Sequence, residues 1–168
     1  MIKIIENILS NDELNYFYNF CDSITDYELD KLKPNAKFSW YKRKSVILSD
    51  TTKNKIFSVL EKNYGLKCKM TPNWVNIITP ETNQNDGYHH DVADASIIIY
   101  LNDNFDGGEF EYIDTNREVK IIKPIKNTGI LLAKNIFHRV KPVTKGRRYS
   151  MVSFFNVDDD FIKQKSII

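Results

Sequence analysis

The sequence predicts a mostly β fold with flanking α-helices: a double-stranded β-helix (jelly roll) supported by N-terminal helices. Two observations lead to this prediction. Apolar residues recur at helical spacing in the first third of the chain, and from about residue 67 the pattern changes to short β-rich runs separated by turn residues. Several short strands after an α-rich start favour packed sheets backed by helices, a shape whose mouth can hold a ligand.

The length of the chain, 168 residues, is that of one domain. We therefore expect a single domain over residues 1–168. Within it, residues 1–66 are expected to form the helical support and the first strands, and residues 67–158 the jelly-roll core.

A first helix is predicted from Asn11 to Ile24. Ser10 and Glu13 fit a capping box, in which the serine side chain and the glutamate side chain each accept a hydrogen bond from the other residue's backbone N–H. The apolar residues that recur at helical spacing in this segment are Leu14, Phe17, Tyr18 and Cys21.

Residues 38–48 are predicted to be extended, and a second helix follows them. Asp50 can cap its start, and Gly65 can end it. Its apolar stripe consists of Ile56, Phe57, Leu60 and Tyr64.

The rest of the chain consists of seven β-rich runs, punctuated by glycine and proline. We predict strands at Lys67–Thr71, Trp74–Thr79, Ala95–Asn102, Glu109–Asp114, Val119–Ile125, Ile130–Ala133 and Tyr149–Val157.

The charge of the chain is nearly balanced, with 24 basic and 22 acidic residues and a net charge of +2. No excess charge draws the molecule to nucleic acid or to a membrane, so neither is expected as a partner. The first residues do not have the pattern of a signal peptide, and no run of about 18 apolar residues occurs. We therefore expect a soluble, cytoplasmic protein. Cys21 and Cys68 fall in different predicted elements and are expected to be reduced.

Two histidines and an aspartate are spaced as ligands of one metal ion. His89 and Asp91 are separated by one residue, so in extended chain both side chains leave the same face, and His138 would arrive from a distant strand. Two imidazoles and one carboxylate, with the opposite positions open, are the ligand set of a mononuclear non-haem iron(II) site. A His-x-Asp pair alone is more often coincidence, but two of only three histidines stand where such a triad needs them. The third, His90, would point the other way.

Arg148 stands ten residues after His138 and shares one face of the last predicted strand with Ser150. A guanidinium there could hold the far carboxylate of a 2-oxo diacid through paired hydrogen bonds, with Ser150 donating another. The alternatives are a surface ion pair for Arg148 or, if the register slips by one residue, Arg147 as the ligand. Tyr100 could place its hydroxyl beside the same carboxylate or simply anchor the core.

Aromatic residues lie near these positions in the sequence. Trp74 and Phe137 are expected in the core. Trp40 and Tyr41 are also expected there, but they lie in a segment that could form part of a lid over a substrate.

Together these residues resemble the Fe(II)- and 2-oxoglutarate-dependent dioxygenases, specifically the prolyl 4-hydroxylase-like group, over about half of the chain. The motifs are His89-x-Asp91, Tyr100-Leu101-Asn102-Asp103 followed by Asp106-Gly107-Gly108-Glu109-Phe110, and His138-Arg139-Val140-x-Pro142-Val143-Thr144-x-Gly146-x-Arg148-Tyr149-Ser150. The double histidine before Asp91 also resembles the catalytic domain of procollagen lysyl hydroxylases, whereas the Tyr-Leu-Asn strand favours proline. One departure is Ile78-Thr79-Pro80, where many prolyl hydroxylases have a tyrosine that helps to hold the oxoacid.

The resemblance implies an enzyme that hydroxylates an unactivated C–H, most of all in peptidyl or free proline, and releases succinate and CO2. The implied catalytic residues are His89, Asp91 and His138, which would hold Fe(II), and Arg148, which would bind 2-oxoglutarate together with Tyr100 and Ser150. O2 is the other co-substrate, and ascorbate would serve as reductant. The partner would be a proline-containing peptide or protein, or a free amino acid.

Three other functions are weighed against this one. A lysyl or small-molecule hydroxylase would keep the chemistry, whereas a non-catalytic jelly-roll binding or sensing module would use the pocket without turnover. Nucleic-acid demethylation of the alkylation-repair type is disfavoured, because those proteins carry a second arginine six residues after the first, where this chain has Phe154.

Overall fold

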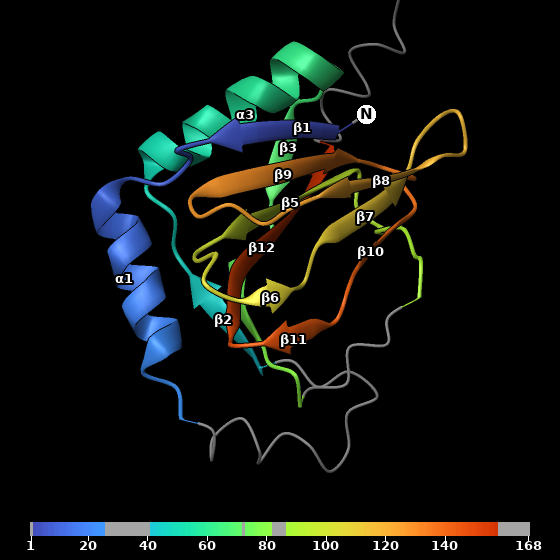
Figure 1. The fold of residues 1–168 in the computed structure, drawn as a ribbon. Coiled ribbons are helices and arrows are strands. Elements are labelled where there is room, and N and C mark those ends of the chain that lie inside the picture. The colour runs from blue at the N-terminus through green and yellow to red at the C-terminus, as the bar shows by residue number, and fades with distance from the viewer. Residues whose placement is uncertain (1, 26–40, 72, 82–86, 158–168) are drawn as a thin grey trace, which may run out of the picture.

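The computed structural model describes residues 2–25, 41–71, 73–81 and 87–157, and for residues 41–46 the backbone alone. These residues form two helices, α1 (Asn11–Asp22) and α3 (Asp50–Tyr64), and a set of antiparallel strands (Figure 1). The strands are β1 (Ile2–Glu6), β2 (Tyr41–Val46), β3 (Cys68–Met70), β4 (Asn73–Ile78), β5 (Ala95–Tyr100), β6 (Asp106–Gly107), β7 (Phe110–Ile113), β8 (Val119–Ile122), β9 (Thr128–Ala133), β10 (His138–Val140), β11 (Val143–Lys145) and β12 (Arg148–Val157).

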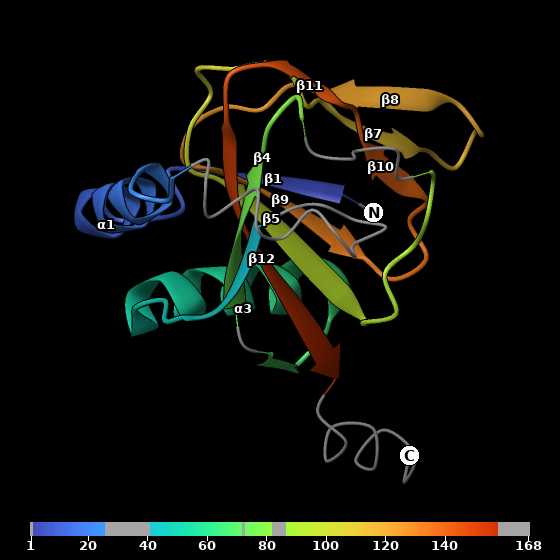
Figure 2. The same ribbon diagram turned by 90° about the horizontal axis from the view of Figure 1, so that it is seen from below.

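The largest unit is a seven-stranded sheet in the order β1-β9-β5-β12-β4-β2, with β3 paired to β12. A three-stranded sheet, β10-β7-β8, and a two-stranded sheet, β11-β6, lie against it. Both helices lie on the other side of the large sheet, so that the sheet separates them from β7, β8 and β10 (Figure 2). The predicted jelly roll supported by N-terminal helices is confirmed.

Each face of the large sheet has its own core. The helices pack on one face, where the apolar residues of the two predicted helical stripes meet the sheet: Leu14, Phe17, Cys21, Ile56, Leu60, Ile97, Ile99, Met151 and Phe155 are all buried. The other face packs against the small sheet through Ile98, Tyr100, Phe110, Ile130 and Leu132. Strand β5 is buried on both faces, which explains why apolar residues occupy consecutive positions from Ile97 to Ile99.

The predicted capping box of α1 is present, with Ser10 accepting from the Glu13 N–H and Glu13 accepting from the Ser10 N–H. The cap predicted for the second helix was wrong by one residue. Ser49, not Asp50, is in the extended conformation and accepts a hydrogen bond from the N–H of Thr52. Asp50 is instead the first helical residue, where its charge meets the positive end of the helix dipole.

Gly65 ends α3 as predicted, with a φ of 62°. The helix α1 ends at Asp22, two residues before the predicted end at Ile24.

The seven predicted strands are present, most with shifted ends. β10 was expected only as the strand that carries His138, without bounds, and β1, β6 and β11 were not predicted. Strands β6, β10 and β11 have only two or three residues each, too few for an alternating pattern. They exist because they pair with distant segments: β6 with β11, and β10 with β7.

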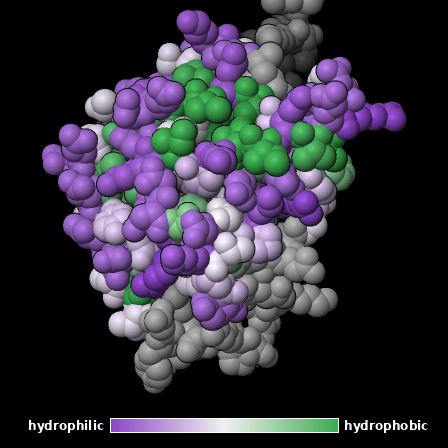
Figure 3. Space-filling view, viewed as in Figure 1, coloured by the Kyte–Doolittle hydropathy of each residue, from purple (hydrophilic) through white to green (hydrophobic). Residues whose placement is uncertain are grey.

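The surface is polar over most of the face in Figure 3, apart from an apolar patch over β1 and β8. Ile4, Val119 and Ile121 of these strands are more than half exposed, at 53%, 53% and 55%. Among the described residues, no helix is both long and apolar enough to span a membrane. Cys21 and Cys68 are free, as expected.

Candidate active site

A cavity of about 300 Å³ opens on the face of the large sheet that carries no helices. Strands β4, β5 and β12 form its floor, and β10 and the segment around His89 form a side wall. All three predicted metal ligands line it, and so does Arg148. The sheet topology therefore brings together residues that are up to 59 positions apart in the sequence.

His89, Asp91 and His138 converge, with one potential ligand atom from each lying within 4.8 Å of the others. His89 and His138 form an isolated antiparallel bridge, in which each N–H donates to the other's carbonyl, at 3.0 and 2.8 Å. Their rings lie 4.6 Å apart, and Asp91 Oδ2 is 3.9 Å from His138 Nε2. No other cluster of His, Cys, Asp and Glu in the described part of the chain has this metal-binding arrangement.

Backbone carbonyls orient both imidazoles. The Nδ1 of His89 lies 3.1 Å from the carbonyl of Gly87, and the Nδ1 of His138 lies 2.9 Å from that of Ile136. Each Nδ1 is then the protonated nitrogen, so each Nε2 is free to bind a metal ion. Phe110 stacks on the His138 ring at 5.3 Å, and burial lowers the pKa of His138, which favours the neutral imidazole that a metal requires.

The Asp91 carboxylate forms a hydrogen bond with a residue that was not predicted from the sequence to belong to the site. The Ser96 hydroxyl of β5 donates a hydrogen bond to Asp91 Oδ2. The same oxygen lies 3.9 Å from His138 Nε2, so Ser96 holds the carboxylate beside this imidazole. The only sequence signal was a hydroxyl in an otherwise apolar strand, on the same face as Ile98.

His90, which was expected to point away from the ligands, does not line the cavity, and its ring packs 5.4 Å from that of Phe137. Two aromatic residues expected in the core are not there. Phe137 is 46% exposed, and Trp74 lines the cavity, 5.2 Å from the ring of Phe154. Trp40 and the side chain of Tyr41, with the expected lid, lie outside the described residues.

Arg148 lies in the cavity wall with only 2% of its surface exposed. The register of β12 decides between the two arginines. Ser150 is paired with Asn76 of β4 on one side and with Tyr100 of β5 on the other, and Arg148 is two residues from Ser150 on the same face. Arg147 points to the helix side of the sheet, where its Nη2 donates to the carbonyl of Ile24 at 2.6 Å.

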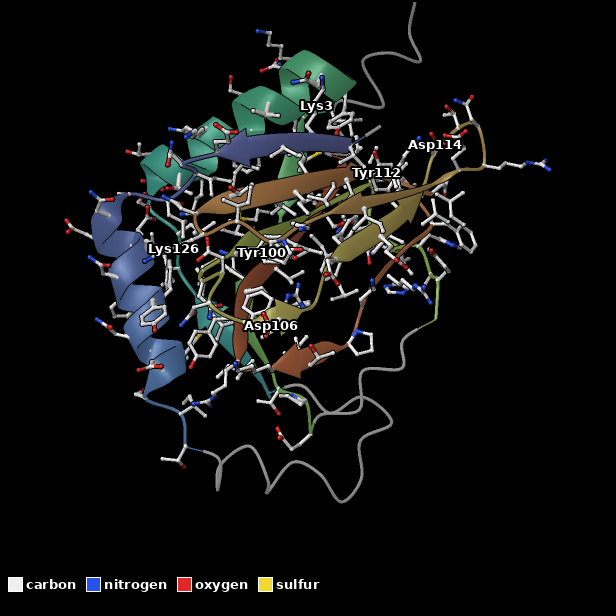
Figure 4. The ribbon with its side chains drawn as sticks, viewed as in Figure 1. Lys3, Tyr100, Asp106, Tyr112, Asp114 and Lys126 are labelled. Carbon is white, nitrogen blue, oxygen red and sulfur yellow. The ribbon has the colours of Figure 1, made fainter. Side chains whose placement is uncertain are left out.

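Four buried polar atoms in this region have no hydrogen-bond partner among the described residues: Asn76 Oδ1, Tyr100 Oη, Arg148 Nε and Ser150 Oγ. Tyr100 lies inside the molecule (Figure 4), and its ring is 5.1 Å from the Arg148 guanidinium carbon. Complete burial raises the pKa of Tyr100. Each unsatisfied buried group costs about 1–3 kcal/mol, so such a cluster indicates a site built for a polar ligand. A guanidinium with hydroxyl donors fits a carboxylate.

Gly108 leaves room for this arginine. Its φ is +67°, and a Cβ at this position would lie 3.2 Å from Arg148 Cδ and 3.0 Å from the Phe105 ring. The absence of a side chain at Gly108 therefore gives the Arg148 side chain its space.

The part of the chain that forms this cavity matches a known protein family. The model of the 2OG-Fe(II) oxygenase superfamily matches residues 75–156, which include the three converging ligands and Arg148. The chain is similar to this superfamily over these residues, which make up just under half of its length. It is a 2-oxoglutarate-dependent dioxygenase whose cofactor is Fe(II) and whose co-substrates are 2-oxoglutarate and O2. No curated protein matches the sequence significantly.

Solved structures share its fold. A prolyl 4-hydroxylase from Pseudomonas putida has a TM-score of 0.67 at 15% identity, over 94% of this chain and 92% of that one. A viral collagen prolyl hydroxylase from Paramecium bursaria Chlorella virus-1, in complex with 2-oxoglutarate, has a TM-score of 0.66 at 17% identity, over 94% and 96%. A Trichoplax adhaerens prolyl hydroxylase bound to a hypoxia-inducible-factor peptide has a TM-score of 0.67 at 14% identity, over 99% and 86%.

Proposed function

We propose that this dioxygenase hydroxylates a prolyl residue of a peptide or protein. The reaction consumes 2-oxoglutarate and O2, inserts one oxygen atom into a C–H bond of the substrate, and releases succinate and CO2. The observation that carries the proposal is the composition of the cavity. Beside the candidate metal and oxoacid ligands, its described lining is largely apolar and partly aromatic, which suits a neutral ring: Trp74, Ile78, Ile98, Val140, Val152 and Phe154.

The candidate ligands have distinct roles in this proposal. His89, Asp91 and His138 would hold Fe(II), because two imidazoles and one carboxylate are the protein ligands of mononuclear non-haem iron sites that also bind co-substrates. Arg148 binds the far carboxylate of 2-oxoglutarate, with Ser150 and Tyr100 as hydroxyl donors. The metal and oxoacid supply the oxidation of the C–H bond.

Residues around the ligands preorganise them. Ser96 fixes the rotamer of Asp91, and Phe110 covers one face of the His138 ring. Asn76 is an additional candidate for the oxoacid site, because its orphaned Oδ1 lies in the row beside Ser150. Its side chain extends this row into the cavity and could accept a hydrogen bond from Arg148 or Ser150.

A lysyl substrate fits the cavity less well. A lysyl ammonium loses its hydration when it enters a narrow pocket and needs a carboxylate partner there. Among the described residues that line the cavity, the only carboxylate is that of Asp91, which the metal requires. A neutral prolyl ring needs no such partner. The likeness to three prolyl hydroxylases also favours proline.

The first experiment tests the cofactor site. Fe(II) and 2-oxoglutarate are added anaerobically to metal-free protein, and the visible charge-transfer band of the chelated oxoacid is recorded. We expect a band in the parent protein, its loss in Asp91→Ala, and a higher 2-oxoglutarate requirement in Arg148→Lys. Arg147→Lys is the control and should retain the band. A parent protein that is folded but binds neither ligand would contradict the assignment of these residues.

The second experiment tests the substrate. Peptides that contain proline, lysine or neither are incubated with enzyme, Fe(II), 2-oxoglutarate and O2, and mass spectrometry detects the gain of one oxygen atom. We expect oxygen gain on proline together with succinate formation. Oxygen gain on lysine alone would replace the prolyl proposal with the lysyl one, without affecting the cofactor site.

A further inference from the structure

A buried carboxylate lies next to the candidate metal site without facing it. Glu111 is in β7 between Phe110 and Tyr112, which pack into the core between the sheets. Because side chains alternate along a strand, Glu111 points to the opposite face of the small sheet. Its side chain is nevertheless only 7% exposed. A glutamate so buried needs partners to offset its desolvation.

Its partners come from the two segments that carry the histidine ligands. Arg139 follows His138 in β10, is paired with Glu111 across the sheet, and donates from Nε to Glu111 Oε2 at 2.6 Å. Tyr88 precedes His89, and its hydroxyl donates to the same oxygen at 3.3 Å. The guanidinium of Arg139 also lies over the Tyr88 ring, 4.6 Å from its centroid. The side chains of Tyr88, Arg139 and Glu111 thus form a row beside the bridge between His89 and His138. We call this set of three side chains the Glu111 row.

The His89 segment needs such support because its backbone is weakly attached. A single bridge, with two hydrogen bonds, joins it to His138. Further along the described chain, the next backbone hydrogen bonds to other segments are those of Asp94, with Phe155 and Lys134. A single bridge allows a segment to pivot about its two hydrogen bonds. The Glu111 row adds a second attachment point one residue away, from side chains on the other face.

We propose that Glu111 is a positioning residue for the metal. Through Arg139 and Tyr88 it holds the His89 segment in register with β10, and so fixes the separation of the His89 and His138 imidazoles. Glu111 itself does not contact the metal. This inference rests on the proposed function, because it takes the triad as the metal site.

Metal affinity measured without turnover tests the proposal. Co(II) is titrated into metal-free protein in the absence of 2-oxoglutarate and O2, and binding is followed by visible absorption. Loss of a group that orients metal ligands typically weakens metal binding by about 10- to 100-fold. We expect about 10-fold weaker binding in Glu111→Ala. Glu111→Gln, which still offers an acceptor to Tyr88 and Arg139, should restore part of the affinity.

Two controls separate positioning from general loss of stability. Glu118→Gln removes an exposed partner of Lys120 near the same sheet and should bind Co(II) as the parent does. Ile56→Val removes one methyl group from the core on the helix side and should lower the melting temperature without changing Co(II) affinity. If Ile56→Val weakens Co(II) binding as much as Glu111→Ala does, the role of Glu111 is merely structural and the proposal is wrong.

A third variant distinguishes failure of this proposal from failure of the metal site. His138→Ala should abolish Co(II) binding. If it does, and Glu111→Ala binds as tightly as the parent, only the positioning role is refuted. If the parent does not bind Co(II), or His138→Ala leaves binding unchanged, the proposed metal site is wrong and the positioning role with it.

Discussion

At the scale of single residues, the most informative atoms are the polar ones left without partners. Ser150, Tyr100 and Asn76 lie in one row across three strands, with Arg148 two positions along β12. Each carries a buried polar atom that no described residue satisfies. Natural proteins rarely leave such groups together without a ligand, because every one destabilises the empty fold. The cluster therefore indicates that a polar co-substrate binds here, because its hydrogen bonds would offset the free-energy cost of burying these polar atoms.

Binding of 2-oxoglutarate should require the planar guanidinium of Arg148 and not only its positive charge. Arg148→Lys keeps the charge but cannot form two parallel hydrogen bonds with a carboxylate. Loss of charged hydrogen bonds costs about 1.5–3 kcal/mol each, so we expect a 2-oxoglutarate Kd about 10- to 100-fold higher, measured by calorimetry with Co(II) present. Arg147→Lys is the matched control, because Arg147 points to the helix side. An equal loss in both variants would contradict the assignment of Arg148.

At the scale of elements, Glu13 joins the two helices. Its carboxylate accepts from the Ser10 N–H at 3.1 Å, the Ser49 N–H at 2.7 Å and the Thr52 hydroxyl at 2.7 Å. Thus one side chain completes the capping box of α1 and binds the first turn of α3. The partial burial of Glu13 raises its pKa, but the hydrogen bonds outweigh this effect and hold the pKa of the carboxyl below its ordinary value.

A lowered pKa has a defined consequence for stability. The contribution of Glu13 is fully present above the pKa of the unfolded chain, about 4.3, and is lost as the pH falls through the lower folded value. Glu13→Gln should cost about 1 kcal/mol of unfolding free energy at pH 7 and progressively less in acid, as measured by urea denaturation. Glu6→Gln, which changes an exposed glutamate at the end of β1 and outside both helices, should show neither effect. A cost that does not change with pH would refute the ionic role.

The connection between β6 and β7 depends on glycine. Gly107 has a φ of +78°, and a Cβ there would lie 2.2 Å from the carbonyl oxygen of Pro142. Gly107→Ala should therefore lower the free energy of unfolding by at least about 2 kcal/mol, measured in urea. Gly87→Ala is the comparison, because within the described part of the chain no atom beyond its sequence neighbours lies within 4 Å of a Cβ at Gly87. Equal stabilities for the two variants would show that the β6–β11 contact can relax.

At the scale of the whole molecule, the cavity joins parts that are far apart in the chain. The three candidate metal ligands come from β10 and the segment before β5, and the candidate oxoacid ligands come from β5 and β12. A ligand that bridges these parts stabilises the folded state, because the unfolded chain cannot reproduce the arrangement.

Binding should therefore raise the melting temperature. Co(II) and 2-oxoglutarate at about 100 times their dissociation constants should each add about 2.7 kcal/mol to the free energy of unfolding. The shift is measured by differential scanning calorimetry under anaerobic conditions. Asp91→Ala should lose the shift with Co(II). A shift that persists in this variant would place the metal elsewhere.

The sequence by itself determined the elements whose signals are local. The capping box at Ser10 and the helical stripes follow from side chains within a few residues of one another, and the long strands follow from their apolar runs. The types and spacing of His89, Asp91 and His138 were also enough to predict a metal site, since only three side chains are needed and histidine is scarce here.

The tertiary structure decided what depends on pairing between distant strands. Side chains alternate every residue along a strand, so the prediction of Arg148 depended on a register that the sequence does not fix. The pairing of β12 with β4 and β5 puts Arg148 on the cavity side and Arg147 on the helix side. The same register brought Asn76 beside Ser150, placed Ser96 against Asp91, and put Trp74 in the cavity wall rather than the core. The local sequence carries no signal for such contacts, because strand pairing is set by packing across the whole sheet.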